Sequence, residues 1–317
     1  MWFSRINFRS LGKTRLVRLF LLLLVLFYIL DACKYTPKKW QEDKLVVTTT
    51  GMLGDAIRNI LPQKYTVYHL MNAGVDPHSY EAKPSDIEQL ALAETIVFNG
   101  LHLEGKMVEL FEKLKKEKMV YAFSYGLNPK DIIDAGPGSH DPHIWLDPFL
   151  WAEGVVALGK QLAKNYPEDA GVIINNAQKY AQTIRTTGEW MRKEINGIPK
   201  DKRVLITSHD AFSYFGRQFE VEVDALQGIS TVSEPGIQTV SSLTKKIIER
   251  KISAVFIESS VSSKSIQALM EACSRKNYSL REGGTLYSDA MGDKAGNAET
   301  YIKMLERNTE ILVKGLK

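Results

Sequence analysis

The chain has 317 residues, of which 44% are hydrophobic and 25% are charged, so it can bury one large core or two medium ones and is neither a disordered tail nor a coiled coil. The chain holds 41 basic and 37 acidic residues, but five of the basic residues and one of the acidic residues lie in residues 1–33, which leaves 36 of each in the remainder. This neutral body argues against nucleic acid as a partner, because nucleic-acid binders concentrate positive charge on their folded domains.

The first 33 residues are typical of an export signal. Residues 1–18 are basic and polar, and Leu19–Leu30 is an unbroken apolar run of 12 residues. As a helix this run would span only about 18 Å of the roughly 30 Å hydrocarbon layer, which favours a secretory signal over a membrane-spanning helix.

The end of this segment, Leu30-Asp31-Ala32-Cys33, resembles the lipobox of bacterial lipoproteins, in which the cysteine receives lipid. We therefore predict lipidation at Cys33. Asp31 departs from the small or neutral residue usual at its position, so an ordinary cleaved signal, or an uncleaved anchor, stays open as an alternative.

Strand-like and helix-like segments alternate along the rest of the chain. Apolar and β-branched runs predict strands at 45–50, 65–70, 95–99 and 119–123, and again at 204–208, 219–226, 254–259 and 285–288, with helical spacing between them. Unbroken apolar strands that alternate with helices are typical of parallel sheets covered on both faces. We expect an α/β fold with two lobes, each containing a four-stranded parallel sheet flanked by helices.

One long helix is predicted between the two sets of strands. Apolar residues recur at helical spacing over residues 169–196, at Ile173, Ala177, Tyr180, Ile184, Met191 and Ile195. At 1.5 Å per residue this helix would extend roughly 42 Å, which is more than one lobe needs. The expected organisation is a signal peptide at 1–33, an N-terminal lobe at 34–168, a rigid connecting helix at 169–198 and a C-terminal lobe at 199–317.

Cys273 is the only cysteine after residue 33, so the mature chain cannot form an intrachain disulfide and depends on its core. The residue lies on the apolar face of a helical pattern, SIQALMEACSRK. We expect it to be a buried, unreactive thiol.

Three histidines and one aspartate lie where predicted strands end. His78 follows the second strand, His143 follows the fourth, His209 ends the fifth and Asp289 ends the eighth. Ligands of open parallel sheets gather at the carboxyl ends of the strands, so these four residues can converge, two from each lobe. The proline before His78 and the proline before His143 fix φ and stiffen the two loops.

Three imidazoles and a carboxylate form a ligand set suited to a divalent transition metal ion. Calcium and magnesium prefer oxygen ligands, and the lack of a thiolate argues against copper(I) and iron–sulfur clusters. A single histidine is more often an ordinary surface or core residue, but two Asp-Pro-His tripeptides at strand ends strengthen the metal hypothesis.

Four segments resemble the signature segments of the metal-binding solute-binding lipoproteins of zinc and manganese ABC transporters, the cluster A-I or cluster 9 family. They are GVDPHSYEAKPSDI, DPHIWLDP, TSHDAFSYFGRQFEVE and YSDAMG, and they occur in the family's order over essentially the whole mature chain. The resemblance implies that His78, His143, His209 and Asp289 are the metal ligands and that one rigid helix bridges two four-stranded lobes.

The same resemblance implies an exported protein, periplasmic or at the cell surface, that is anchored by lipid. It would capture one divalent metal ion between its lobes and deliver the ion to an ABC permease. We expect no enzymatic activity, and we expect a monomer.

The identity of the metal stays open among zinc, manganese and iron. Many manganese- or iron-binding members have glutamate where this chain has His209, and many zinc-binding members have a histidine-rich loop where residues 125–142 contain only His140. Imidazole is a good ligand for zinc, while a chelating Asp289 keeps manganese possible.

The other candidates are weaker. We expect His140 to be a solvated loop residue, although it could recruit ions at the mouth of the cleft, and we expect His69 and His102 to be structural or exposed. Asp210, Glu234 and Glu258 are possible acceptors for imidazole N–H groups, or else cap and turn residues.

Two other functions stay open. A zinc hydrolase of the cell envelope would usually keep an open position on its metal, and the sequence has no H-E-x-x-H motif. An adhesin with a structural metal would unfold when the ion is lost, whereas a cargo ion would exchange with both lobes folded.

Overall fold

The computed structural model describes residues 44–233 and 236–317. The predicted signal peptide, Cys33 and Glu234 therefore lie outside the described residues. In the ranges described, no helix is both long enough and apolar enough to cross a membrane.

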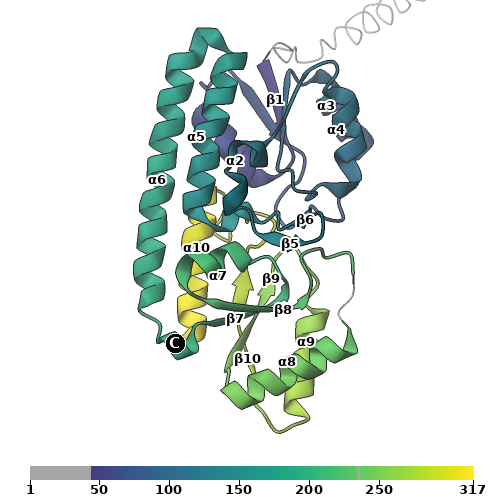
Figure 1. Cartoon of the computed structure of the whole chain (residues 1–317), viewed down its shortest axis with the longest axis vertical. Coiled ribbons are helices and arrows are strands. Elements are labelled where there is room, and N and C mark those ends of the chain that lie inside the picture. Colours follow the sequence, from purple (N-terminus) through teal and green to yellow (C-terminus); the bar gives the residue numbers. More distant parts are fainter. Residues whose placement is uncertain (1–43, 234–235) are drawn as a thin grey trace, which may run out of the picture. The chain divides into compact units, whose positions relative to one another are not determined.

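The N-terminal half contains the predicted four-stranded parallel sheet, in the order β2-β1-β3-β4. Its strands are β1 (Leu45–Thr48), β2 (Thr66–His69), β3 (Thr95–Phe98) and β4 (Met119–Ala122), and its helices are α2 (Gly51–Ile60), α3 (Pro84–Leu92) and α4 (Val108–Leu114). Alternate residues of β1 enter two different cores: Val46 packs with residues of α2, and Val47 packs with residues of α3 and α4. Helices thus cover both faces of the sheet (Figure 1).

The C-terminal half has the other four strands that the sequence predicts. They are β7 (Val204–His209), β8 (Glu222–Gln227), β9 (Ala254–Glu258) and β10 (Arg281–Leu286), with helices α7 (Ser213–Phe219), α8 (Ile237–Arg250), α9 (Lys264–Ser274) and α10 (Tyr301–Leu316). The fold class is α/β with parallel strands, as predicted.

The hydrogen bonding of these four strands differs in detail from the expected single sheet. Parallel ladders join β7 to β8 and β10 to β9, and the two pairs lie next to each other along β7 and β9. Glu258, the last residue of β9, supplies part of the reason. Its Oε1 accepts the backbone N–H groups of Ser208 and His209, at 2.8 and 3.0 Å, so a side chain bonds these donors instead of a strand.

A short antiparallel hairpin was not predicted. Its strands are β5 (Asp134–Gly136) and β6 (Ser139–His140), and it carries His140 on an exposed edge.

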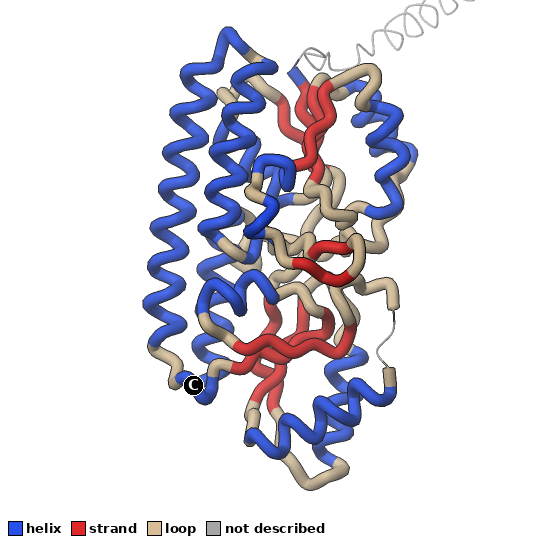
Figure 2. The backbone as a smooth tube through the Cα atoms, viewed as in Figure 1, coloured by secondary structure: helices blue, strands red, loops and turns tan. Residues whose placement is uncertain are grey.

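The long helix that the sequence predicts is confirmed as α6 (Ala170–Asn196), which has 27 residues. It follows α5 (Pro148–Asn165) and packs against it. The helix also contacts α2 from the N-terminal half, and α7 and α10 from the C-terminal half, and the long pair of helices is visible in Figure 2. All six residues of the predicted apolar stripe are buried.

Cys273 is fully buried in α9, where it packs with Ile266 and Leu269. Burial raises the pKa of its thiol. The prediction of a buried thiol is confirmed.

Candidate metal centre

The structure brings the four candidate ligands together from four separate elements. His78 lies in the loop between β2 and α3, His143 precedes the 3₁₀ turn Ile144–Leu146, and His209 is the last residue of β7. Asp289 lies three residues after the end of β10, slightly beyond the predicted strand end. One ligand atom from each residue lies within 4.8 Å of the other three.

The ring nitrogens and the carboxylate face a common point. The Nε2 atoms of His78 and His143 are 3.1 Å apart. Asp289 Oδ1 lies 3.4 Å from His143 Nε2, and its Oδ2 lies 3.2 Å from His209 Nε2. All four side chains are buried, so a single ion at this point would be shielded from solvent.

Each Asp-Pro-His tripeptide forms a turn closed by its own aspartate. Asp76 Oδ1 accepts the backbone N–H of His78 at 2.8 Å, and Asp141 Oδ1 accepts the backbone N–H of His143 at 2.9 Å. The intervening proline fixes φ, so these turns place the histidines before any ion is bound.

Carboxylates also face the outer nitrogens of two rings. Asp141 Oδ1 lies 2.7 Å from His143 Nδ1, and Glu258 Oε2 lies 2.6 Å from His209 Nδ1. A metal-bound histidine usually donates its other N–H to such a group, which fixes the tautomer and strengthens the ligand.

The sequence suggested Glu258 for this role but missed Asp141. The signal for Asp141 was the tripeptide itself, because an aspartate two residues before a histidine can fold back onto its N–H and its ring. The third acidic candidate, Asp210, instead accepts the Ser213 hydroxyl at 2.8 Å, as a turn residue does.

The charges at the centre are strongly coupled. Burial alone would raise the pKa of Asp289, but His209 and His143 outweigh it and hold that pKa well below its usual value. Burial opposes the charged forms of His143 and His209 as well. Nevertheless Asp141 and Asp289 raise the pKa of His143 to about 9, and Asp289 and Glu258 raise that of His209. His78 behaves differently, because burial lowers its pKa to about 4.

Several buried polar atoms of the candidate ligands have no hydrogen-bond partner in the part of the chain that the structure describes. Within the described residues, both carboxylate oxygens of Asp289 and Nε2 of His209 are buried with no partner in hydrogen-bond geometry. Buried polar atoms are nearly always satisfied in folded proteins. A divalent cation bound among them would satisfy these atoms, and the ligand chemistry fits a transition metal.

The remaining histidines lie outside the centre. His102 and His140 are exposed, and His69 is half-buried at the end of β2, where its Nδ1 lies 3.5 Å from an Arg58 nitrogen. The positions of His69 and His102 agree with the prediction that they are structural or exposed. His140 is exposed to solvent as predicted, but it lies in β6 and not in a loop.

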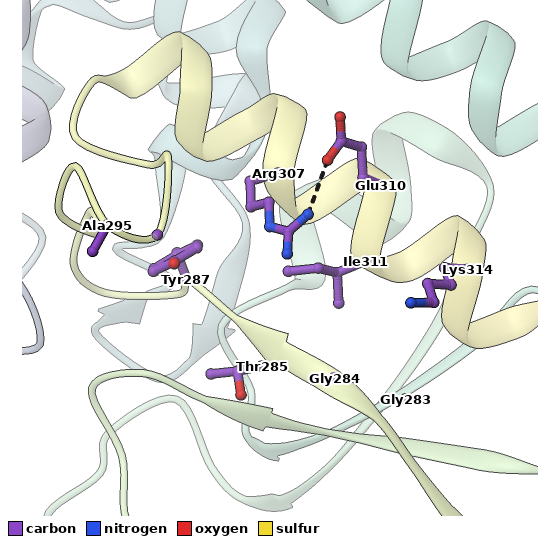
Figure 3. A pocket seen from close by; sticks show the side chains of 10 residues that line it. Gly283, Gly284, Thr285, Tyr287, Ala295, Arg307, Glu310, Ile311 and Lys314 are labelled. Atoms are coloured by element: carbon purple, nitrogen blue, oxygen red, sulfur yellow. Dashed lines mark hydrogen bonds and ion pairs between the residues drawn. The ribbon is translucent and has the colours of Figure 1, made fainter.

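A cavity of about 550 Å³ lies between β10 and α10 (Figure 3). Its lining contains none of the four candidate ligands, and the charge of Arg307 there is paired with Glu310 at 3.1 Å. This cavity is therefore separate from the candidate metal centre.

Comparisons with known proteins agree on one family. The family model described as zinc-uptake complex component A, periplasmic, matches residues 46–315. The manganese-binding lipoprotein MntA of Bacillus subtilis is 40% identical over 281 residues, which cover 88% of this chain and 92% of the relative. The zinc-binding protein TroA of Treponema pallidum is 39% identical over 272 residues, which cover 86% and 88%. A solved structure of the periplasmic zinc binding protein TroA from Treponema pallidum matches with a TM-score of 0.84 at 39% identity, covering 86% of this chain and 99% of that one.

Proposed function

The chain belongs to the zinc-uptake complex component A family, and from this membership we propose that it is the substrate-binding protein of an ABC importer for a divalent transition metal. Similar relatives are named for manganese and for zinc. Others are named as substrate-binding lipoproteins of metal ABC transporters. The protein captures zinc or manganese outside the cytoplasm and delivers the ion to its transporter.

We propose that His78, His143, His209 and Asp289 hold this ion. The observation that carries the proposal is the buried cluster of three ring nitrogens and one unsatisfied carboxylate, all within 4.8 Å. Neutral imidazoles donate lone pairs, and the carboxylate neutralises one charge of the ion. Imidazole-rich sites favour zinc over manganese in intrinsic affinity.

The family is one of uptake components and not of enzymes. Neither the hydrolase nor the adhesin with a structural metal gains support from the comparisons.

We further propose the two-lobe organisation, with lobes at 34–168 and 199–317 joined by the helical segment 169–198. Contacts of α6 with helices of both halves support this division. The names of the relatives support a lipid anchor, which we assign to Cys33, and therefore a periplasmic or cell-surface location. We propose in addition that the protein is a monomer.

Competitive zinc and manganese titration of protein expressed from residue 34 onward tests the function. We expect one exchangeable ion per chain. His143→Ala should weaken binding by more than about 100-fold, because it removes a ligand. His140→Ala is the matched control, since this exposed histidine lies three residues away and should leave affinity unchanged.

The proposal would be contradicted if the wild-type protein bound no divalent ion. It would also be contradicted if the His143→Ala variant bound the ion as tightly as the wild type. Hydrolysis of ester or peptide probes that disappears in His143→Ala would favour the enzyme instead.

A further inference from the structure

Two of the candidate ligands are tied to each other across the two halves of the chain. The indole N–H of Trp145, two residues after His143, donates to the carbonyl oxygen of Ser288 at 2.7 Å. Ser288 directly precedes Asp289. Trp145 is fully buried, so this bond fixes the His143 turn to the Asp289 segment.

A second buried hydrogen bond connects the segment of a third ligand, His209, to the His143 turn. The hydroxyl of Tyr214, in the helix that follows His209, donates to the carbonyl oxygen of Asp141 at 2.9 Å. Tyr214 is fully buried as well. His143, His209 and Asp289 are therefore held in one frame by contacts that do not involve the ion.

His78 is held differently. It lies in a loop whose residues 72–74 and 79 are exposed, and it is 8% exposed, whereas the other three ligands are at most 1% exposed. Among the four candidate ligands, only His78 lines a cavity of about 730 Å³, which His102 and His140 also line. His78 is therefore the ligand that separates this cavity from the buried centre.

One carboxylate ties the His78 loop to the other half of the chain. Asp76 Oδ2 accepts the hydroxyl of Thr231, in the segment after β8, at 2.7 Å. The same oxygen accepts the Ser79 hydroxyl at 2.9 Å, and Oδ1 accepts the His78 N–H. Asp76 thus shapes the turn of His78 and also binds the segment after β8, in which Ser230 and Val232 line the same cavity.

We propose that the metal ion enters and leaves by displacement of the His78 loop, and that the Asp76–Thr231 hydrogen bond is a latch that sets the dissociation rate. The proposal rests on the proposed function, since it needs an ion in the centre. Loss of the latch frees one ligand while the frame of the other three stays intact. The dissociation rate should therefore rise without loss of the fold.

Stopped-flow transfer of zinc from the loaded protein, expressed from residue 34, to excess chelator measures this rate. Thr231→Val keeps the shape and removes the hydroxyl, and it should accelerate dissociation about tenfold, as expected for loss of one hydrogen bond to a charged acceptor. Thr231→Ser keeps a hydroxyl and should restore a rate near that of the wild type.

Two controls separate the latch from general loop effects. Ser230→Ala changes the adjacent exposed residue, whose hydroxyl oxygen accepts only a local bond from Val232 N–H at 3.4 Å among the contacts described, and it should leave the rate unchanged. The metal-free melting temperature should be the same for the wild type and all three variants.

An unchanged dissociation rate in Thr231→Val would overturn the latch, as would a Thr231→Ser variant that releases zinc as fast as Thr231→Val. A lower metal-free melting temperature in Thr231→Val alone would make the bond structural and would also overturn it. Wild-type protein that binds no zinc would instead overturn the proposed function, and the latch with it.

Discussion

At the scale of single residues, two carboxylates lie against the nitrogens of His143 and His209 that face away from the centre. Asp141 and Glu258 lie 2.7 and 2.6 Å from these nitrogens. Both acids are buried, so water competes little for the contacts. Asp141 and Glu258 do not contact the ion themselves. They act on it by orienting the imidazole rings, so they are positioning residues.

Asp141→Asn should weaken zinc binding by about 10- to 100-fold, because the amide no longer stabilises the correct ring tautomer by its charge. Chelator competition measures the affinity. Asp134→Asn is a matched control, since Asp134 Oδ1 accepts the N–H of Gly136 in a similar turn that contains no histidine. Equal affinities for the wild type and Asp141→Asn would show that the contact is irrelevant to binding.

Metal binding should release protons at neutral pH. The raised pKa values of His143, to about 9, and of His209 favour the positively charged, doubly protonated form of both rings in the metal-free protein at pH 7. His78, with a pKa of about 4, is already neutral. An ion must displace one proton from each of the first two rings, so affinity rises with pH and falls as the pH is lowered.

Calorimetry in buffers of different ionisation enthalpy counts these protons. We expect about two protons released per ion at pH 7. A binding enthalpy independent of the buffer would mean that the rings are neutral before the ion arrives, against this description of the centre.

The sequence predicted the four candidate ligands at the residue scale because strand ends and the repeated tripeptide mark them. Asp141 was missed because its role depends on the carboxylate turning back onto the ring, which composition and spacing do not reveal. The latch between Asp76 and Thr231 joins residues 155 positions apart. No local pattern predicts such a pair.

At the scale of elements, the apolar runs predicted most strands to within a few residues. β10 begins at Arg281, four residues before the prediction. Among the described strands it pairs with β9 alone, and its start, Arg281-Glu282-Gly283-Gly284, has no apolar pattern. This part of the strand packs closely without apolar side chains. A Cβ on Gly283 would lie 2.6 Å from the ring of Phe256.

The close packing of α6 against α5 leads to a prediction about stability. A Cβ at Gly188 would lie 2.9 Å from the ring of Phe149 and 3.0 Å from Pro148 Cγ. Gly188→Leu should therefore lower the free energy of unfolding by roughly 1–3 kcal/mol through overpacking.

Gly171 lies in the same helix, and a Cβ there would meet nothing within 4 Å. Gly171→Ala should leave stability unchanged or raise it by up to about 1 kcal/mol, through helix propensity. Urea unfolding of the metal-free proteins compares the two. Equal stability of Gly188→Leu and the wild type would show that the helices separate without cost.

At the scale of the whole molecule, the ion should be cargo and not a structural support. The cores of both halves are formed by apolar residues, and none of the four candidate ligands belongs to them. The metal-free protein should therefore remain folded and unfold cooperatively. Added zinc should raise the melting temperature only by mass action, to an extent that depends on its free concentration.

Melting curves recorded with and without chelator, followed by circular dichroism, test this expectation. Loss of secondary structure in chelator at room temperature would favour the adhesin with a structural ion over a transport protein.

Anomalous diffraction from crystals of the zinc-loaded protein, expressed from residue 34, tests the central claim most directly. We predict one strong peak bounded by Nε2 of His78, His143 and His209 and by the carboxylate of Asp289, at the roughly 2.0–2.2 Å typical of zinc–nitrogen and zinc–oxygen bonds. A principal peak elsewhere, for example beside His102 and His140, would contradict the account. So would a peak that is not bound by all four of these residues.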